Sequence, residues 1–315
     1  MKTSNKHPWR MFLLLLLSSI AFAVAAPAQN LKVTLLGTGS PEPRMDRFGP
    51  SILVEAGEKK LLFDCGRGAT QRIEHIKIPF IEIDALFLTH LHSDHVVGIP
   101  DLWLTGWVRG RKVPLGVWGP AGTREMMSHL EEAYQFDIQI RQMEGKLPAQ
   151  GVAVVAKDIE QGVVYDNAGI KVTAFAVDHG QVKPAMGYRI DFAGHSVVLS
   201  GDTRYSENLI QFSQGADVLI HEVVDPDAFR RKNPSFSPER LQTIVGHHTT
   251  AEQAGRVFAQ VKPKLAVYSH IVPGDSTDLI PLTRKTYPGP LEVGEDLMTL
   301  EIGKTVAVHR AATLN

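Results

Sequence analysis

The chain has 315 residues, of which 43% are hydrophobic and 21% are charged, and its formal net charge at pH 7 is −1. This length and hydrophobic content suffice for a sizeable core, in one large domain or two small ones. The single cysteine, Cys65, excludes an internal disulfide and a cysteine-rich metal motif, so metal ligands must come from the 13 histidines and the carboxylates. Because Cys65 follows an apolar, strand-like run, we expect a buried core thiol.

The first 28 residues have the three-part layout of a secretory signal peptide. A basic start precedes the apolar run Met11–Val24, and candidate cleavage sites follow at Ala25 and Ala28. This run of about 14 residues is shorter than the roughly 20 that a membrane-spanning helix needs. We therefore predict that residues 1–28 are removed and that the mature protein is periplasmic or secreted. An uncleaved N-terminal anchor is the alternative.

Signal cleavage would also change the charge of the protein. It removes three basic residues and no acidic ones, which moves the formal charge from −1 to −4. A mildly acidic protein has no general attraction for polyanions, which weighs against a nucleic-acid partner, although a local basic patch stays open. No later segment is long and apolar enough to cross a bilayer, so we expect no stable membrane span after cleavage.

Apolar runs bounded by glycine and polar residues predict strands in the first half of the chain. The predicted strands are Leu31–Leu36, Ser51–Ala56, Lys60–Asp64, Asp84–Thr89 and Leu115–Gly119. Helices are predicted over Ala69–Ile76 and Gly122–Tyr134. The middle, residues 136–167, mixes Gly145, Pro148 and Gly151 with short apolar runs, and we expect a few short strands and loops there.

The second half returns to short apolar strands separated by turns. The predicted strands are Ile170–Val177, Met186–Asp191, Ser196–Leu199, Val218–Ile220, Leu265–Tyr268, Leu297–Ile302 and Thr305–Val308. One amphipathic helix is predicted over Ala251–Val261. Strands in hairpins with interspersed helices indicate an α/β layered architecture, and the lack of an obvious linker favours one domain over residues 29–315.

The segment from His90 to His95 reads His-Leu-His-Ser-Asp-His and holds four metal-capable side chains directly after a predicted buried strand. Neutral imidazole and carboxylate are the ligands that suit zinc and related ions. On a loop that leaves a strand, His90 and His92 can face one side of a cavity while Asp94 and His95 face a neighbouring position. That arrangement would serve two metals. A lone histidine is usually a surface or core residue, but three with one Asp in this order are rare by chance.

Three further candidate ligands lie at the ends of predicted strands: His179, Asp202 and His270. Strand ends converge on one rim of a sheet, so these side chains can reach the same cavity as the histidine loop. Each of the three, taken alone, is better explained as a hydrogen-bonded loop residue.

The order of these residues resembles the metallo-β-lactamase superfamily and, within it, the ribonuclease Z branch over nearly the whole mature length. The stretches that carry the resemblance are Leu36-Gly37-Thr38-Gly39-Ser40, Phe63-Asp64-Cys65-Gly66, Gly187-Tyr188-Arg189, Gly201-Asp202-Thr203, His221-Glu222 and His248-Thr249-Thr250-Ala251-Glu252-Gln253-Ala254. The resemblance implies a four-layer αββα sandwich with the metals at one edge.

The resemblance also implies a centre of two Zn²⁺ ions, with Mn²⁺ as an alternative. One zinc is implied at His90, His92, His179 and Asp202. The other is implied at Asp94, His95, Asp202 and His270, with Asp202 bridging both together with a hydroxide. Asp64 is implied to orient the histidine loop, and Glu222 and His248 to support proton transfer. The resemblance therefore implies a metal-dependent hydrolase with Asp94, Glu222 and His248 as candidate catalytic residues.

The chain departs from the tRNA-processing members of the branch, which carry a long arm between the Gly-Tyr-Arg and Gly-Asp-Thr motifs. Here about eleven residues, 190–200, join these motifs, enough only for a tight hairpin. Val223 and Val224 replace the small and hydroxyl residues that are usual after His-Glu in tRNA processors. A signal peptide would also remove the protein from cytoplasmic tRNA. These features oppose a tRNA 3′-endonuclease.

Three classes of function remain. The first is hydrolysis of a small anionic phosphodiester or sulfate ester, as in arm-less phosphodiesterase and arylsulfatase relatives. The second is a lactonase or β-lactamase; Asp202 favours the first class or a lactonase, because β-lactamases of this fold generally lack a bridging carboxylate. The third, a non-catalytic metal-binding module, is disfavoured by a complete ligand set beside a proton-transfer pair. By analogy with relatives, we expect a homodimer.

Two sets of residues near the metal loop leave alternatives open. Trp103 and Trp107 lie at i and i+4, and either line the substrate mouth or form the core face of a helix. Arg109, Arg111 and Lys112 either attract an anionic substrate or lie in a solvated loop, and the solvated loop is favoured.

Overall fold

The computed structural model describes Met1 and residues 31–311. The predicted signal peptide, residues 1–28, lies outside these described residues except for Met1. Within the described part, none of the helices combines the length and the apolar character that a bilayer crossing requires.

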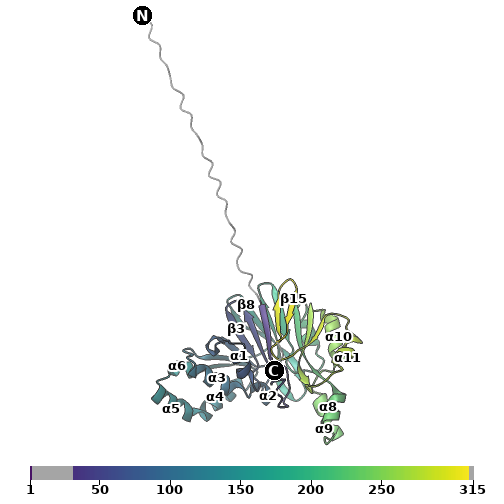
Figure 1. Ribbon diagram of the computed structural model, residues 1–315, viewed down its shortest axis with the longest axis horizontal. Helices are drawn as coiled ribbons and strands as arrows, with labels where there is room; N and C mark the ends of the chain where they lie inside the picture. The colour runs from purple at the N-terminus through teal and green to yellow at the C-terminus, as the bar shows by residue number, and fades with distance from the viewer. Residues whose placement is uncertain (2–30, 312–315) are drawn as a thin grey trace.

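Two mixed β-sheets stack face to face at the centre of the molecule (Figure 1). The first sheet has the order β15-β14-β1-β2-β3-β4-β5-β6. Its strands are β1 Leu31–Gly37, β2 Ser51–Ala56, β3 Lys59–Phe63, β4 Ala85–Phe87, β5 Leu115–Gly119, β6 Val154–Asp158, β14 Thr299–Ile302 and β15 Val306–His309. The second sheet has the order β13-β12-β11-β10-β9-β8-β7. Its strands are β7 Gly162–Asn167, β8 Ile170–His179, β9 Val182–Phe192, β10 His195–Leu199, β11 Val218–Val224, β12 Leu265–Val272 and β13 Leu291–Val293.

Helices cover the outer faces of both sheets (Figure 1). Those that follow strands of the first sheet are α1 Ala69–His75, α2 Ser93–Val96, α3 Ile99–Val108, α4 Thr123–Ala133, α5 Gln135–Gly145 and α6 Ala149–Val152, with a short 3₁₀ turn at Phe80–Glu82. Those of the second half are α7 Glu207–Phe212, α8 Pro226–Lys232, α9 Pro238–Val245, α10 Ala251–Val261 and α11 Leu279–Arg284. Helices α8 and α9 project from the body of the molecule as a hairpin (Figure 1).

Side chains alternate between the two faces of each strand, and this explains why helices cover both sheets to give four layers. In β4, Ala85 and Phe87 join the apolar cluster between the two sheets, while Leu86 joins the cluster under α1 and α3. In β11, Val218 and Ile220 face the cluster between the sheets, while Leu219 packs under α10. Successive side chains of a strand point to opposite faces, so strands with apolar residues at every position must be covered on both sides. The predicted αββα sandwich is therefore confirmed.

The predicted strands and helices all appear, but the middle of the chain was interpreted wrongly. Residues 135–145 form helix α5 rather than strands or loops. The glycine and proline residues that suggested loops lie at or beyond the C-terminal end of this helix, where Lys146 adopts a left-handed conformation with φ of 50°. Strands β6 and β7 then follow, as expected for the rest of this segment.

The carboxyl ends of adjacent parallel strands lie at the same edge of each sheet. Strands β3, β4 and β5 run parallel in the first sheet, and β10, β11 and β12 run parallel in the second. The histidine loop follows β4, and Gly201-Asp202 follows β10. The fold thus delivers residues from distant parts of the sequence to one rim of the sandwich.

Candidate metal centre

The histidine loop is held against the preceding sheet by backbone contacts. The Cys65 N–H donates to the His95 carbonyl at 2.8 Å, and the Gly98 N–H donates to the Cys65 carbonyl at 2.9 Å. A Cβ at Gly98 would lie 2.4 Å from the carbonyl oxygen of Gly66, so only glycine allows this approach. As predicted, the Cys65 thiol is buried, and burial raises its pKa far above the usual range. It acts as a small core side chain that lets the loop pack closely.

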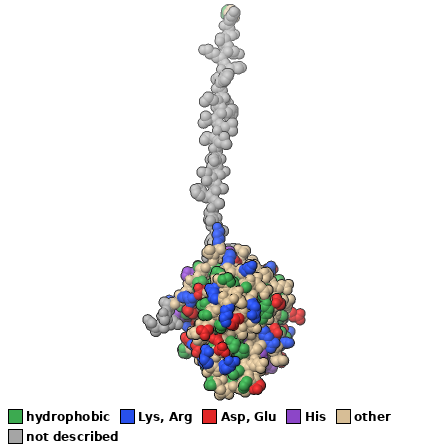
Figure 2. Space-filling view, turned by 90° about the vertical axis from the view of Figure 1, so that its right-hand side faces the viewer, with side chains coloured by type: hydrophobic (Ala, Val, Ile, Leu, Met, Phe, Trp, Pro, Cys, Tyr) green, Lys and Arg blue, Asp and Glu red, His purple; other side chains and the backbone are tan. Residues whose placement is uncertain are grey.

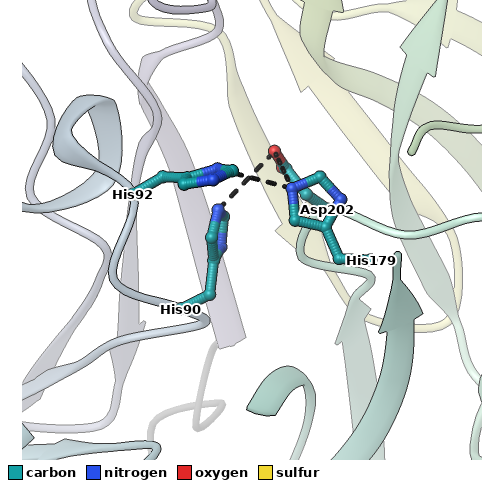
Figure 3. Close-up of side chains that lie close together, drawn as sticks. All are labelled: His90, His92, His179 and Asp202. Carbon is teal, nitrogen blue, oxygen red and sulfur yellow. Dashed lines mark hydrogen bonds and ion pairs between the residues drawn. The ribbon is translucent and has the colours of Figure 1, made fainter. Parts of the chain in front are cut away.

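One group of candidate ligands consists of His90, His92, His179 and Asp202, whose ligand atoms all lie within 4.8 Å of one another. Figure 3 shows the three rings and the carboxylate converging from separate segments. Oδ2 of Asp202 lies 3.8 Å from Nε2 of His90 and 3.8 Å from Nε2 of His179. Nδ1 of His92 lies 3.4 Å from Nε2 of His179. The first set implied by the resemblance is therefore assembled.

A second group consists of Asp94, His95 and His270. Nε2 of His270 lies 3.4 Å from Oδ2 of Asp94 and 3.2 Å from Oδ2 of Asp202. Nε2 of His95 lies 3.4 Å from the same oxygen of Asp202. One carboxylate oxygen of Asp202 thus lies between both groups, which is the position of a bridging ligand.

The residues present fit two divalent cations. Nε2 of His90, Nε2 of His95 and Oδ1 of Asp202 are buried and have no hydrogen-bond partner among the described residues. Buried polar atoms without partners cost free energy, so a group of them facing one point indicates a ligand for that point. Imidazole nitrogens and carboxylate oxygens without thiolates suit Zn²⁺ or Mn²⁺.

Hydrogen bonds on the far side of three rings leave their Nε2 atoms free. Asp64 can only accept, so Nδ1 of His95 donates to it at 2.8 Å. The carbonyl of His247 likewise accepts from Nδ1 of His179 at 2.9 Å. The Thr89 hydroxyl donates to Asp64 at 2.8 Å and therefore accepts from Nδ1 of His90 at 3.0 Å. Each Nε2 faces Asp202 and can offer a lone pair to a cation bound there. Burial opposes the charge of His95, but Asp202 and Asp64 outweigh it and raise the pKa of His95, so this ring gives up a proton when a cation binds.

Asp64 acts as the predicted orienting residue. Besides His95, its carboxylate accepts from the backbone N–H and the hydroxyl of Thr89 at 2.8 Å each. Its backbone has φ of 55°, a left-handed conformation that a non-glycine residue adopts only at a cost. The surrounding contacts therefore hold this carboxylate in a position that turns the histidine loop toward the centre.

His270 lies inside strand β12, not after it as the sequence indicated. The pairing between β11 and β12 shifts by one residue between His221 and Val223, which leaves Ser269 and His270 as a bulge opposite Glu222. The φ of His270 is 44°, in the left-handed region. The bulge turns this ring away from the sheet and toward the metal centre. A bulge can be recognised only when the pairing strand is known, so the sequence did not reveal it.

Burial and charge set the protonation of the cluster. Burial lowers the pKa of His90 well below its usual value and lowers that of His179 to about 4, so both rings are neutral and able to bind a cation. Burial opposes the charge of Asp202, but the surrounding histidines outweigh it and hold the pKa of Asp202 well below its usual value. The bridging position therefore carries a carboxylate anion.

Glu222 and His248, the predicted proton-transfer pair, lie beside Asp202 and His270. Oε1 of Glu222 accepts from the N–H groups of Thr203 and Thr249 at 3.2 Å and 2.9 Å. Nδ1 of His248 is 3.3 Å from Oε2 of Glu222, but neither atom has a partner with hydrogen-bond geometry among the described residues. The two predicted proton-transfer residues are therefore a close pair without a formed hydrogen bond. Burial lowers the pKa of His248 to about 4 and raises that of Glu222.

A pocket of about 630 Å³ opens over the centre. Its floor includes His92, Asp94, His179, Asp202 and His270. His247 and His248 line it as well, so His247, which the sequence left without a role, faces the same space. Its walls come partly from α8 and α9, which the sequence analysis missed; Asp225-Pro226 and Ser237-Pro238 are the N-cap signals that mark both helix starts.

The tryptophan and arginine residues near the histidine loop do not reach this pocket. Trp103 and Trp107 are fully buried in α3, and their Nε1 atoms donate to the carbonyls of Val152 and Pro148 at 2.7 Å and 2.9 Å. The core alternative for them is therefore confirmed. Arg111 was expected in a solvated loop, which is wrong. It is buried and donates to the carbonyls of Trp103 and Phe80.

Comparisons with known proteins agree with this geometry. A family model described as beta-lactamase superfamily domain matches residues 59–271. Ribonuclease Z of Mycobacterium avium (strain 104) is 36% identical over 279 residues, covering 86% of this chain and 98% of that protein. The human tRNase Z short form has a TM-score of 0.64 at 22% identity, covering 86% of this chain and 99% of that one. Zn²⁺-bound PqqB from Methylobacterium extorquens has a TM-score of 0.64 at 18% identity, covering 86% of this chain and 100% of that one.

The family model spans more than half of the chain, and the Mycobacterium avium relative matches over nearly its full length. The histidine and aspartate residues that the sequence predicted as ligands are the ones the fold brings together at one rim. The chain therefore belongs to the metallo-β-lactamase superfamily, in its ribonuclease Z-like branch, and is a metal-dependent hydrolase.

Proposed function

We propose that this protein hydrolyses a small phosphodiester with two divalent cations, Zn²⁺ or alternatively Mn²⁺. The observation that carries the proposal is the position of Asp202, whose Oδ2 lies 3.2–3.8 Å from Nε2 atoms in both ligand groups. A carboxylate shared between two groups suits a pair of metals that clamps the oxygens of an in-line displacement at phosphorus. Zn²⁺-bound PqqB and the ribonuclease Z relative support the metal and the bond type.

The two cations would supply a nucleophile at neutral pH, by lowering the pKa of water, and would stabilise charge on the phosphoryl oxygens. The protein's own residues provide the rest. His90, His92, His179, Asp94, His95, His270 and Asp202 would hold the cations. The Asp64 carboxylate keeps the His95 ring turned toward Asp202.

His248 is placed to hold a proton near the departing ester oxygen. It lies with Asp202 and His270 in a group whose ligand atoms are within 4.8 Å of one another, and it lines the pocket. Glu222, fixed by two backbone N–H groups, lies 3.3 Å behind Nδ1 of His248. Glu222 in that position orients the ring, and because burial raises the pKa of Glu222, the pair retains a proton that Glu222 can pass to Nδ1 while the other ring nitrogen delivers its own proton to the ester oxygen.

Pocket size and surface charge favour a small substrate. A volume of about 630 Å³ lies within the range of small-molecule sites. Lys232 is the one Lys or Arg among the described residues that line this pocket, whereas a polyanion site needs several cations. On the face shown in Figure 2, Lys and Arg are mixed with Asp and Glu. A small sulfate ester has the same anionic character and is part of the same proposal.

Cleavage of RNA at a 3′ end is the second candidate, because of one observation. The alignment covers 98% of the Mycobacterium avium ribonuclease Z within 279 residues, so that protein has no long segment that this chain lacks. The missing arm therefore does not separate this chain from its ribonuclease Z relatives. Lactone or β-lactam opening has no comparable support.

A substrate panel tests the proposal. Bis-p-nitrophenyl phosphate, p-nitrophenyl sulfate, a lactone, nitrocefin and a precursor tRNA would be tested with zinc, manganese and chelator. We expect chelator-sensitive turnover of the phosphodiester to be highest. Faster turnover of the lactone or nitrocefin would show that the enzyme cleaves a cyclic ester or amide instead of a phosphodiester. Faster cleavage of precursor tRNA would establish the second candidate. No chelator-sensitive turnover of any substrate would favour a non-catalytic role.

A further inference from the structure

The hairpin of α8 and α9 forms a wall of the pocket above the candidate metal ligands. Phe229 from α8, Phe236 from the connecting turn and Ile244 from α9 all line the pocket. The rings of Phe229 and Phe236 meet edge to face, with centroids 6.3 Å apart. An apolar wall of this kind lies beside the metal ligands rather than in the core.

The hairpin is tied at both ends to the proton-transfer pair. Helix α8 begins at Pro226, shortly after Glu222, and α9 ends at Val245, shortly before His248. The Asp225 N–H donates to the Val272 carbonyl at 2.7 Å, which fixes the start of the hairpin against β12. The wall therefore has a defined position relative to the residues that face the reacting ester.

The two phenylalanine rings are only partly covered by the protein itself. Ala228 is the one buried residue of α8, and α9 has none. Phe229 and Phe236 are therefore in contact with the space of the pocket, where water would have to cover them. Removing such surface from water is favourable, so an apolar group that fills this space would bind.

Two cations lie at the wall, and one of them is already paired with carboxylates. Lys232 is the one Lys or Arg side chain among the described residues that line the pocket. Its Nζ lies 2.8 Å from Glu42 and 3.1 Å from Asp275, so its charge is already neutralised. Arg240 of α9 lies with its guanidinium carbon 3.7 Å from the centroid of the Phe236 ring and adds one cation beside the wall, whereas recognition of successive phosphates needs several free cations.

We propose that Phe229 and Phe236 form a specificity subsite for an apolar group, aromatic or bulky alkyl, carried by the anionic ester. This inference rests on the proposed function, because it assumes that the anionic part of the substrate binds at the metals. It narrows the substrate class to esters with one anionic centre and one apolar substituent.

Binding of two simple anions to the zinc-loaded protein tests the subsite without catalysis. Phenylphosphonate and methylphosphonate have the same anionic head and differ only in the apolar group. Calorimetry should show phenylphosphonate binding at least about tenfold more tightly, because even one methylene in an apolar pocket changes affinity by this order. Turnover of bis-p-nitrophenyl phosphate would be measured in parallel.

Substitutions of Phe229 and Phe236 test whether these two rings cause the preference for phenylphosphonate. The double variant F229A/F236A should bring the ratio of the two dissociation constants to about threefold or less, with methylphosphonate affinity and zinc content unchanged. F229L/F236L should keep most of the preference, because leucine preserves an apolar surface. F136A is the matched control, since Phe136 is an exposed phenylalanine on α5, away from the pocket lining, and should leave the ratio unchanged.

The outcomes separate the two proposals. Equal affinity for both phosphonates, or an unchanged ratio in the zinc-loaded double variant, would overturn the subsite while leaving ester hydrolysis intact. Failure of both anions to bind, with no chelator-sensitive turnover of the diester, would instead remove the proposed function. A short RNA that binds more tightly than phenylphosphonate would show that the wall receives a polyanion, against our inference.

Discussion

Nδ1 of His95 donates a 2.8 Å hydrogen bond to Asp64, and this contact turns Nε2 of the same ring to within 3.4 Å of Asp202. The carboxylate thus decides which nitrogen of His95 is free for a cation, although it does not itself face the pocket opening over the metals. The contact links the strand end after β3 to the loop after β4, two segments that pair side by side in the first sheet.

Replacing Asp64 should therefore weaken metal binding rather than abolish the fold. In D64N the amide N–H₂ would face Nδ1–H of His95, which favours the wrong tautomer. We expect zinc affinity to fall by about 10- to 100-fold, the usual effect of losing such a partner. Competition with a chromophoric chelator measures it, with D137N on exposed α5 as control. Unchanged affinity in D64N would show that His95 is oriented by other contacts.

Asp202 should determine the number of metals. Because its Oδ2 faces both ligand groups, D202N replaces the shared anion by a neutral amide and disfavours two adjacent dications. Elemental analysis after dialysis should show about one zinc per chain instead of two, and diester turnover should fall more than in D64N. Two tightly held zinc ions in D202N would refute a bridging role.

His221 should make the metal-free protein sensitive to acid. It is fully buried, and burial lowers its pKa to about 4 from an ordinary 6.5. The unfolded chain therefore takes up the proton first, so stability is lost as pH falls from about 6.5 to about 4. Between pH 7 and pH 5 the loss from this one group is about 2 kcal/mol.

Urea unfolding of chelator-treated protein at these two pH values measures the effect. The variant H221Q should lose about 2 kcal/mol less than the parent over this interval, whatever its stability at pH 7. H129Q is the control, because His129 is exposed on α4. Equal pH sensitivity of H221Q and the parent would mean that folding does not change the pKa of His221, against the effect of burial.

Trp103 should affect stability but not substrate recognition. Its side chain is fully buried and its Nε1 donates to the Val152 carbonyl at 2.7 Å. We expect W103A to reduce the free energy of unfolding by about 3–5 kcal/mol, as large-to-small core changes do. The milder W103F should fold with an unchanged KM for the diester. A raised KM in W103F would place this residue at the substrate mouth after all.

The predicted signal peptide can be tested directly. Expression of the full chain in a bacterium should give a periplasmic or secreted protein whose intact mass corresponds to a start after Ala25 or Ala28. Fractionation followed by mass spectrometry measures both. A full-length protein retained in the membrane fraction would establish the uncleaved anchor instead, and full-length soluble protein in the cytoplasm would contradict export.

Much of the architecture followed from local patterns. Runs such as Ala85–Phe87 are apolar at every position, and this signals a strand covered on both faces before any contact is known. Helix α5 was missed because Gly145 and Pro148 suggested a loop, although Gly145 is the last residue of the helix and Pro148 lies beyond it. The burial of Arg111 was predicted wrongly, because a charged side chain is expected to be solvated unless the carbonyls that accept its hydrogen bonds are known.

By itself the sequence determined which side chains are able to bind metals and the order in which they occur, because residue type and the position after a strand are local properties. Only the tertiary structure decided that one oxygen of Asp202 lies between both ligand groups, that a bulge turns His270 inward, and that Phe229 and Phe236 wall the pocket. These relationships join residues far apart in the chain. They arise from strand register and packing between sheets, which no local pattern encodes.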